Sequence, residues 1–110
     1  MAYDEALADR IRDHLEGSPG LSEKKMFGGL AFLLGGNMAV VASGQGGLMV
    51  RVGPDAAPGL LAGTPAVQVE MRGRPMNGWL RVPAEHLDED ADLETWVERG
   101  AEFARLLPSK

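Results

Sequence analysis

The first apolar residues of the chain recur at every fourth position: Tyr3, Leu7, Ile11 and Leu15. This spacing predicts an amphipathic helix over residues 3–16, because side chains four positions apart lie on the same helical face. Asp4 and Glu5 fall in its first turn, where the helix dipole favours negative charge. The Gly-Ser-Pro-Gly run at 17–20 is expected to end this helix.

A second amphipathic helix is predicted near the C-terminus. The residues that share its apolar face are Leu93, Trp96, Val97, Gly100, Phe103, Ala104 and Leu107. Asp90 or Asp92 is the expected N-cap, since a short side chain with an oxygen acceptor can satisfy the first free backbone N–H groups. Pro108 ends the helix. Trp96 and Phe103 are both expected in the core.

Between the helices, the apolar pattern changes to that of short strands. Four strands are predicted, at about 24–28, 30–35, 38–43 and 48–52. Their apolar residues are Phe32, Leu34, Met38, Val40, Val41, Leu48, Val50 and Val52. Glycine-rich segments at 35–37 and 44–47 separate the strands, and glycine adopts the positive φ of tight hairpin turns without steric cost. Two hairpins in series predict an antiparallel meander.

The remaining segments complete an α+β pattern. Residues 54–63 predict a short helix, and the alternation from Val67 to Met71 predicts a half-buried strand. Arg72-Gly73-Arg74-Pro75 is expected to form a turn or wide loop before a last strand that contains Trp79, Leu80 and Val82. The predicted order is α-β-β-β-β-α-β-β-α. We therefore expect one α+β domain over residues 1–110, with an antiparallel sheet of about 5–6 strands and the terminal helices packed on it.

The amino-acid composition limits the chemistry and the cellular compartment expected for this domain. The 110 residues are 45% apolar and 25% charged, and they include no cysteine, which excludes disulfides, thiolate metal sites and a cysteine nucleophile. We therefore expect a cytoplasmic protein. Residues 26–50 carry no charge, but paired glycines interrupt them at hairpin spacing, so strands are expected here rather than a membrane span. The acidic start of the chain does not resemble a secretory signal.

Charge is unevenly distributed along the chain. Residues 1–23 contain six acidic and two basic residues, residues 24–82 two acidic and six basic, and residues 83–110 eight acidic and three basic. One interpretation is that two solvated helix faces flank a sheet with few charges. The other is a basic sheet surface that meets an acidic partner or a phosphate. The candidate binding residues of that surface are Arg51, Arg72, Arg74 and Arg81.

Nucleic-acid binding is not the favoured use of these arginines. The chain carries a net charge of −5, whereas a duplex-binding domain usually has a basic footprint. Single-strand binders stack bases on aromatic side chains, and the predicted strands supply only Phe27, Phe32 and Trp79. Direct nucleic-acid binding is therefore considered unlikely. The internal methionines Met26, Met38, Met49, Met71 and Met76 are interpreted either as core filler or as an adaptable contact surface.

Catalytic and metal-binding patterns are not found. The glycine-rich segment 44–47 leads into a strand and lacks the lysine of a phosphate-binding loop, and Ser43 lacks the glycines of a nucleophile elbow. His14 and His86 have no partner at metal-ligand spacing. The acidic run 85–94 lacks the spacing and central glycine of a calcium loop, so it is interpreted as the start of a solvated helix. We expect no enzymatic activity, no metal and no cofactor.

Several short motifs together resemble the TfoX N-terminal domain family. They are Lys25-Met26-Phe27-Gly28-Gly29-Leu30-Ala31-Phe32, Gly36-Asn37-Met38, Gly47-Leu48-Met49-Val50-Arg51-Val52-Gly53, Arg74-Pro75-Met76, Gly78-Trp79, Val82-Pro83, Leu93, Trp96-Val97 and Leu106-Leu107-Pro108. The most distinctive element is the signature Met26, Phe27, Gly28 and Gly29. Its two glycines are expected to allow a bulge or a close backbone approach, and Phe27 to anchor the first helix on the sheet.

The resemblance also implies a fold and a biological setting. The implied fold is an antiparallel sheet with packed helices, similar to secretion-chaperone-like folds. TfoX proteins regulate bacterial competence and are thought to act as co-activators beside the cyclic-AMP receptor protein. Those regulators carry a second, helical C-terminal domain, whereas this sequence ends at Lys110. We therefore expect a stand-alone relative, for which the competence role is in doubt.

Three hypotheses about function follow. The leading one is a non-enzymatic interaction module that binds a regulatory protein, with the transcription machinery as a candidate partner, or that associates with itself. Unpaired edge strands of the predicted sheet would favour such pairing. The alternative is a small-molecule binding domain with a pocket between sheet and helices, near Arg51 and Trp79. An enzyme of unrecognised type is the third.

Overall fold

The computed structural model describes residues 3–26 and 28–109 of the chain. Its helices and strands follow the predicted order, with a 3₁₀ turn at Ala84–His86 before the last helix. The elements are α1 (Glu5–Leu15), β1 (Leu21–Met26), β2 (Gly29–Leu34), β3 (Asn37–Ala42), β4 (Leu48–Arg51), α2 (Ala57–Gly63), β5 (Val67–Met71), β6 (Arg74–Val82) and α3 (Asp90–Leu106). The predicted α+β fold class is confirmed.

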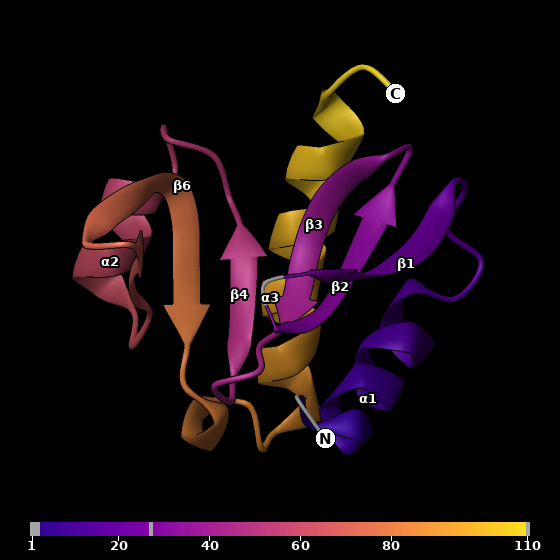
Figure 1. Cartoon of the computed structure of the whole chain (residues 1–110), viewed down its shortest axis with the longest axis horizontal. Coiled ribbons are helices and arrows are strands. Elements are labelled where there is room, and N and C mark those ends of the chain that lie inside the picture. Colours follow the sequence, from indigo (N-terminus) through magenta and orange to yellow (C-terminus); the bar gives the residue numbers. More distant parts are fainter. Residues whose placement is uncertain (1–2, 27, 110) are drawn as a thin grey trace.

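All six strands form one antiparallel sheet, in the order β1-β2-β3-β4-β6-β5 (Figure 1). The first four strands form the expected meander. The chain then crosses through α2 to the edge strand β5 and returns as β6, which pairs with β4. Because β6 lies between β4 and β5, its residues sit inside the sheet, and Leu80 and Val82 are fully buried.

Several element boundaries lie one to three residues from the predicted ones, and β1 is the clearest case. Strand β1 begins at Leu21 rather than at residue 24, and Leu21 pairs with Leu34 across the hairpin. Because β1 is an exposed edge strand, its residues from Ser22 to Lys25 are polar. The start of the strand therefore has no apolar pattern from which it could be predicted. Of the turn or wide loop predicted at 72–75, the turn is observed: it has two residues, since Met71 pairs with Arg74 and Glu70 with Pro75.

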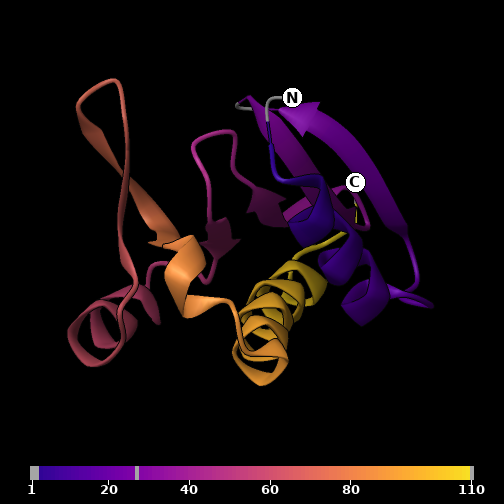
Figure 2. The ribbon, with the colours of Figure 1, turned by 90° about the horizontal axis from the view of Figure 1, so that it is seen from below.

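The helices cover one side of the sheet. Figure 2 shows α1 and α3 together on that side, whereas the β5–β6 hairpin projects away from them. The core beneath these helices contains large side chains that are fully buried, among them Ile11, Leu15, Phe32, Leu48, Val50, Leu80, Leu93 and Val97. Their burial supplies most of the driving force for folding, since removal of apolar surface from water is the dominant favourable term.

The two terminal helices begin differently. The Oδ1 atom of Asp4 accepts hydrogen bonds from the backbone N–H groups of Ala6, at 2.9 Å, and Leu7, at 3.2 Å, so α1 has a side-chain cap. The N-cap of α3 is Glu89, and no side chain bonds to its free N–H groups. The prediction that Asp90 or Asp92 caps α3 is therefore wrong. Both lie inside its first turn, where the helix dipole still favours their charge.

Helix α3 lies very close to β3 at Gly100. A Cβ atom at this position would overlap the Ala39 carbonyl oxygen and lie 2.8 Å from Val40 Cγ1. The contact is made where β3 is irregular, since the pairing between β2 and β3 shifts between Phe32 and Leu33. Glycine is therefore required at position 100 for steric reasons, although it is an unfavourable residue within a helix.

We expect the Gly100→Ala substitution to lower the free energy of unfolding by about 1–3 kcal/mol, because overpacking against the β3 backbone outweighs the gain in helix propensity. Urea unfolding followed by circular dichroism measures this change. Gly59→Ala in α2 is the matched control, since a Cβ there meets no atom within 4 Å. It should be neutral or stabilising. A Gly100→Ala protein as stable as the parent would contradict the close packing.

An ion pair joins α1 to the edge strand β1. Arg12 donates hydrogen bonds to both carboxylate oxygens of Glu23, Nε to Oε2 at 2.6 Å and Nη2 to Oε1 at 2.8 Å. The Arg12 guanidinium lowers the pKa of Glu23 below its ordinary value of 4.5. The two side chains remain 40% and 33% exposed, so water screens the pair. Its contribution to stability is therefore small despite the two-point geometry.

We expect Glu23→Gln to lower the free energy of unfolding by at most about 1 kcal/mol at neutral pH. Because the folded-state pKa of Glu23 is lowered, its contribution is present above the unfolded-state pKa and is lost as pH falls through the folded-state value. The stability difference from the parent should therefore shrink below about pH 4.5. Urea midpoints measured across pH give this profile. Arg12→Gln should lose at least as much, because it also removes the ion pair of Arg12 with Asp9. A double variant that loses the sum of both effects would argue against the Arg12–Glu23 pair.

Candidate functional site

The side of the sheet opposite α1 and α3 carries a second apolar cluster. Five strands each contribute one buried residue to a row across the sheet: Ala31, Val41, Met49, Trp79 and Val69, from β2, β3, β4, β6 and β5. Trp79 is 6% exposed and Met49 3%, although neither belongs to the core beneath the helices. The row is buried by neighbouring side chains of the same face, since Met26, Leu33, Met38 and Met76 pack against it half-exposed. These nine residues are called the helix-free face below.

The methionines of the chain gather on this side. Met26, Met38, Met49 and Met76 belong to the helix-free face, and the remaining internal methionine, Met71, lines a pocket beside it. None of the five lies in the core beneath the helices. Three of them are half-exposed on the face, where their flexible thioether side chains can adapt to a contacting surface. This distribution favours the contact-surface interpretation of the methionines over core filler.

Two of the four candidate arginines meet at the rim of this face. Arg72 and Arg81 line a pocket of about 360 Å³, together with Ser43, Gln45 and Met71. Met49 and Val69 also line it, so the pocket is continuous with the helix-free face. Glu70 is the only acidic residue among those that line it. The pocket, called the basic pocket below, therefore offers more positive than negative charge next to apolar surface.

Arg81 is held in place by the β3–β4 turn. Its Nη1 donates to Ser43 Oγ at 3.1 Å and to the Gly46 carbonyl oxygen at 3.2 Å, and its Nη2 donates to Gln45 Oε1 at 3.2 Å. These bonds use part of the donor capacity of the guanidinium, which has five N–H groups in all. Arg81 therefore orders the turn and also contributes charge to the basic pocket.

Arg72 has an unusual backbone conformation. Its φ is +54°, and it is the one residue other than glycine with positive φ among those that the structure describes. Gly73 follows with φ +78°, so the two form a hairpin turn of the kind that is usually Asn-Gly. A left-handed conformation costs a branched or long side chain about 1–2 kcal/mol. The exposed arginine is thus kept at the pocket rim at the expense of stability.

The other two candidate arginines lie elsewhere. Arg74 is exposed at the start of β6, beside the same turn, but it does not line the basic pocket. The Arg51 guanidinium carbon lies 5.4 Å from the ring centroid of Phe103 on α3. Cation–π contact with Phe103 therefore places Arg51 beside a different feature, the cleft between α2 and α3.

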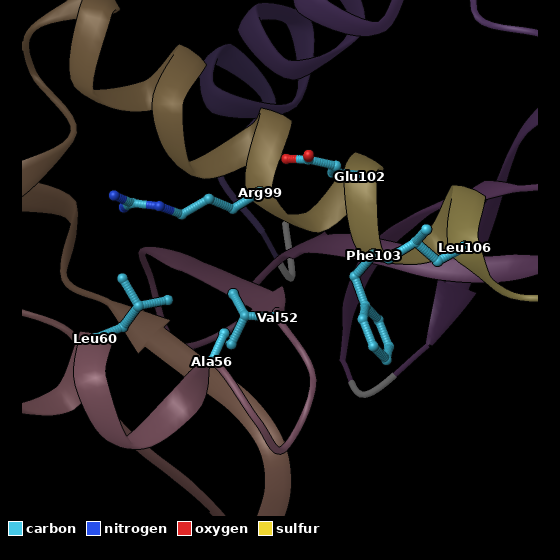
Figure 3. Close-up of a pocket in the computed structure, with 7 residues that line it drawn as sticks. All are labelled: Val52, Ala56, Leu60, Arg99, Glu102, Phe103 and Leu106. Carbon is cyan, nitrogen blue, oxygen red and sulfur yellow. The ribbon is translucent and has the colours of Figure 1, made fainter.

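That cleft has a volume of about 310 Å³ and is lined by Val52, Ala56, Leu60, Arg99, Glu102, Phe103 and Leu106 (Figure 3). It matches the predicted pocket between sheet and helices, but only in part. Arg51 and Trp79 are paired across β4 and β6, but only Arg51 contacts the Phe103 wall of the cleft. Trp79 belongs to the helix-free face and does not line the cleft. Phe103 is half-exposed, so its expected place in the core is also wrong.

Of the two signature glycines, Gly29 makes the predicted close backbone approach, whereas a Cβ at Gly28 would meet no atom within 4 Å. A Cβ at Gly29 would overlap the carbonyl oxygen of Ala42 on β3, so the two strands approach closely at this point. The irregular pairing of β2 with β3 occurs between Phe32 and Leu33 and not at the glycines. Met26 contributes to the helix-free face. Phe27 lies outside the described residues, so its predicted contact with α1 stays a prediction.

Two further features of the described residues bear on chemistry. Across residues 3–26 and 28–109, no three histidine, aspartate or glutamate side chains gather into a potential metal-binding group. None of the described helices has both the length and the apolar composition needed to cross a bilayer.

The fold and these surfaces define a class of protein: a small α+β domain whose antiparallel sheet has helices on one side only. The family model of the TfoX N-terminal domain matches residues 13–104. The chain therefore belongs to the TfoX N-terminal domain family, as the sequence motifs predict. The comparison with curated proteins found no match.

Sequence reasoning missed the residues that arrange the basic pocket. The sequence places Ser43 at the end of a predicted strand and Gln45 in a predicted hairpin turn, yet Arg81 donates hydrogen bonds to both side chains. Their proximity depends on the pairing of β4 with β6, which places Met49 opposite Arg81. Local sequence patterns do not predict the pairing of β4 with β6, because α2 and β5 separate the two strands in the chain.

We expect Arg72→Asn to raise the free energy of unfolding by about 0.5–1 kcal/mol, since asparagine tolerates the left-handed conformation better than arginine. Urea midpoints measure the gain. Arg74→Asn, two residues later on regular strand backbone, is the matched control and should not stabilise the protein. Equal or lower stability of Arg72→Asn would mean that the turn is not strained at this residue.

Proposed function

We propose that this domain is a non-enzymatic interaction module that binds a partner protein through the helix-free face and the basic pocket. The observation that carries the proposal is the collection of all five internal methionines on the side without helices. Proteins that bind varied or adaptable partners often use methionine-rich surfaces, because the unbranched side chain can repack around different shapes.

The charge at the rim indicates the chemistry of the partner. Arg72 and Arg81 line the pocket beside the apolar row, and Lys24 is exposed on β1 opposite Ala31 of that row. An acidic segment that also carries apolar side chains would complement this surface in both charge and hydrophobicity. The many acidic residues on α1 and α3 lie on the other side of the sheet, so they do not neutralise it.

Family membership supports a regulatory use of this binding. The resemblance to TfoX proteins implies a regulatory setting, and a cysteine-free chain suits the cytoplasm in which such partners occur. A transcription regulator or polymerase subunit is therefore the first class of partner to test. Self-association is the other form of the same proposal, and sedimentation velocity of the purified protein distinguishes the two.

We expect partner capture from a native bacterial lysate to depend on the helix-free face. The baits are the parent protein, Arg72→Asn, Met38→Glu, and Arg105→Gln as a matched arginine control on α3. Proteins identified by mass spectrometry should be retained by the parent and by Arg105→Gln, and lost from the other two baits. Capture should also weaken at high salt, because rim charges are screened.

The Arg72→Asn bait makes this experiment decisive. It is expected to be more stable than the parent, so loss of a partner from it would not come from misfolding. Retention of the same proteins on all four baits would rule out the helix-free face as the interface. A monomeric protein that captures nothing above background would remove the proposal itself.

A further inference from the structure

The cleft between α2 and α3 combines apolar walls with one arginine at its rim. Val52 and Leu60 come from the end of β4 and from α2, and Phe103 and Leu106 from α3 (Figure 3). Leu106 is 78% exposed and adds apolar surface at the rim of the cleft. The volume of about 310 Å³ lies at the lower end of the range for ligand pockets, so a small ligand fits.

Arg99 supplies the polar end of this cleft. Its guanidinium carbon lies 4.5 Å from the centroid of the Trp96 ring, so the aromatic face holds the side chain in place. None of the salt bridges between described residues involves Arg99. Figure 3 shows its side chain extending from α3 toward Leu60 on α2. A pre-positioned guanidinium without an acidic partner is suited to two-point binding of a carboxylate.

The side of the cleft formed by Phe103 is also held in place by its contacts. The Phe103 ring packs against Gly53, where a Cβ atom would lie 2.8 Å from its Cδ1, and Arg51 stacks on the same ring. Arg51 therefore adds positive potential close to the cleft. Glu102 is the only acidic residue that lines it, and its side chain is exposed to water, which weakens its effect on a bound anion.

We propose that this cleft binds a small apolar monocarboxylate, with the hydrocarbon part against Val52, Leu60 and Phe103 and the carboxylate on Arg99. The apolar walls favour the hydrocarbon part through burial, and Arg99 selects the acid over a neutral analogue of the same shape. The cleft lies on the helix side of the sheet, so this proposal stands independently of partner binding by the helix-free face.

A series of straight-chain acids tests the apolar part. Butanoate, hexanoate and octanoate are titrated into the ¹⁵N-labelled protein, and backbone amide shifts are followed by NMR. Affinity should rise about fourfold for each added methylene until the cleft is filled, since each buried methylene contributes about 0.8 kcal/mol. The shifts should be confined to α2, residues 52–56 and the second half of α3. Octanamide, which lacks the charge, should bind at least about tenfold more weakly than octanoate.

Three variants test the polar end. Arg99→Gln should weaken octanoate binding about tenfold, the lower range for a hydrogen bond to a charged group. Glu102→Gln should strengthen it, because the only acid at the rim is neutralised. Arg105→Gln, on the same helix but outside the cleft, should leave it unchanged. Ala56→Leu narrows the cleft without altering charge, so it should reduce the gain per methylene.

Specific results would overturn the proposal. These are no saturable shift with octanoate at millimolar concentration, equal affinity for octanoate and octanamide, or shifts centred on the helix-free face. Equal weakening by Arg99→Gln and Arg105→Gln would also overturn it, because a general loss of positive charge would then explain both. The amide spectrum of each variant without ligand shows whether its fold is retained.

Discussion

The distance between α3 and β3 is set by Gly100, because any side chain there would overlap the Ala39 carbonyl. This contact brings the whole inner face of α3 onto the middle of the sheet, where Leu93, Trp96 and Val97 become buried. The same contact also influences the packing at the C-terminal end of α3. Phe103 reaches past the sheet and packs on Gly53, after the last residue of β4. The cleft is lined on one side by residues of this second half of α3 and on the other by the end of β4 and by α2.

The same arrangement leaves the other side of the sheet without helices. All three helices are used on one side, so the side chains that point to the other must bury one another. A row with one residue from each of five strands does this, and half-exposed methionines complete the cover. Long unbranched side chains suit that task because they can lie along an irregular surface. The solution buries Trp79 and Met49 almost fully and still leaves an adaptable outer layer.

Much of this fold is readable from local patterns. The helical spacing of apolar residues in α1 and α3 depends only on neighbours in the chain, and so do the glycine pairs between β2, β3 and β4. Both patterns predict the right elements. The place of β6 between β4 and β5 is different, since alternation tells which side chains share a face but not which strand lies alongside. The basic pocket could not be predicted from the sequence for the same reason. Arg72 and Arg81 are nine positions apart, and only the pairing of β5 with β6 places them at one rim.

Arg72 is the point at which local preference and observed structure disagree. Gly73 accepts a positive φ readily, but the residue before it would be asparagine in the turn that this hairpin adopts. Such departures from local preference are expected where a side chain is needed for something other than stability. The rim of the basic pocket is such a place, because Arg72 supplies a positive charge there next to the apolar residues Met49 and Val69. The strained turn and the gathered methionines therefore point to the same side of the sheet by independent physical arguments.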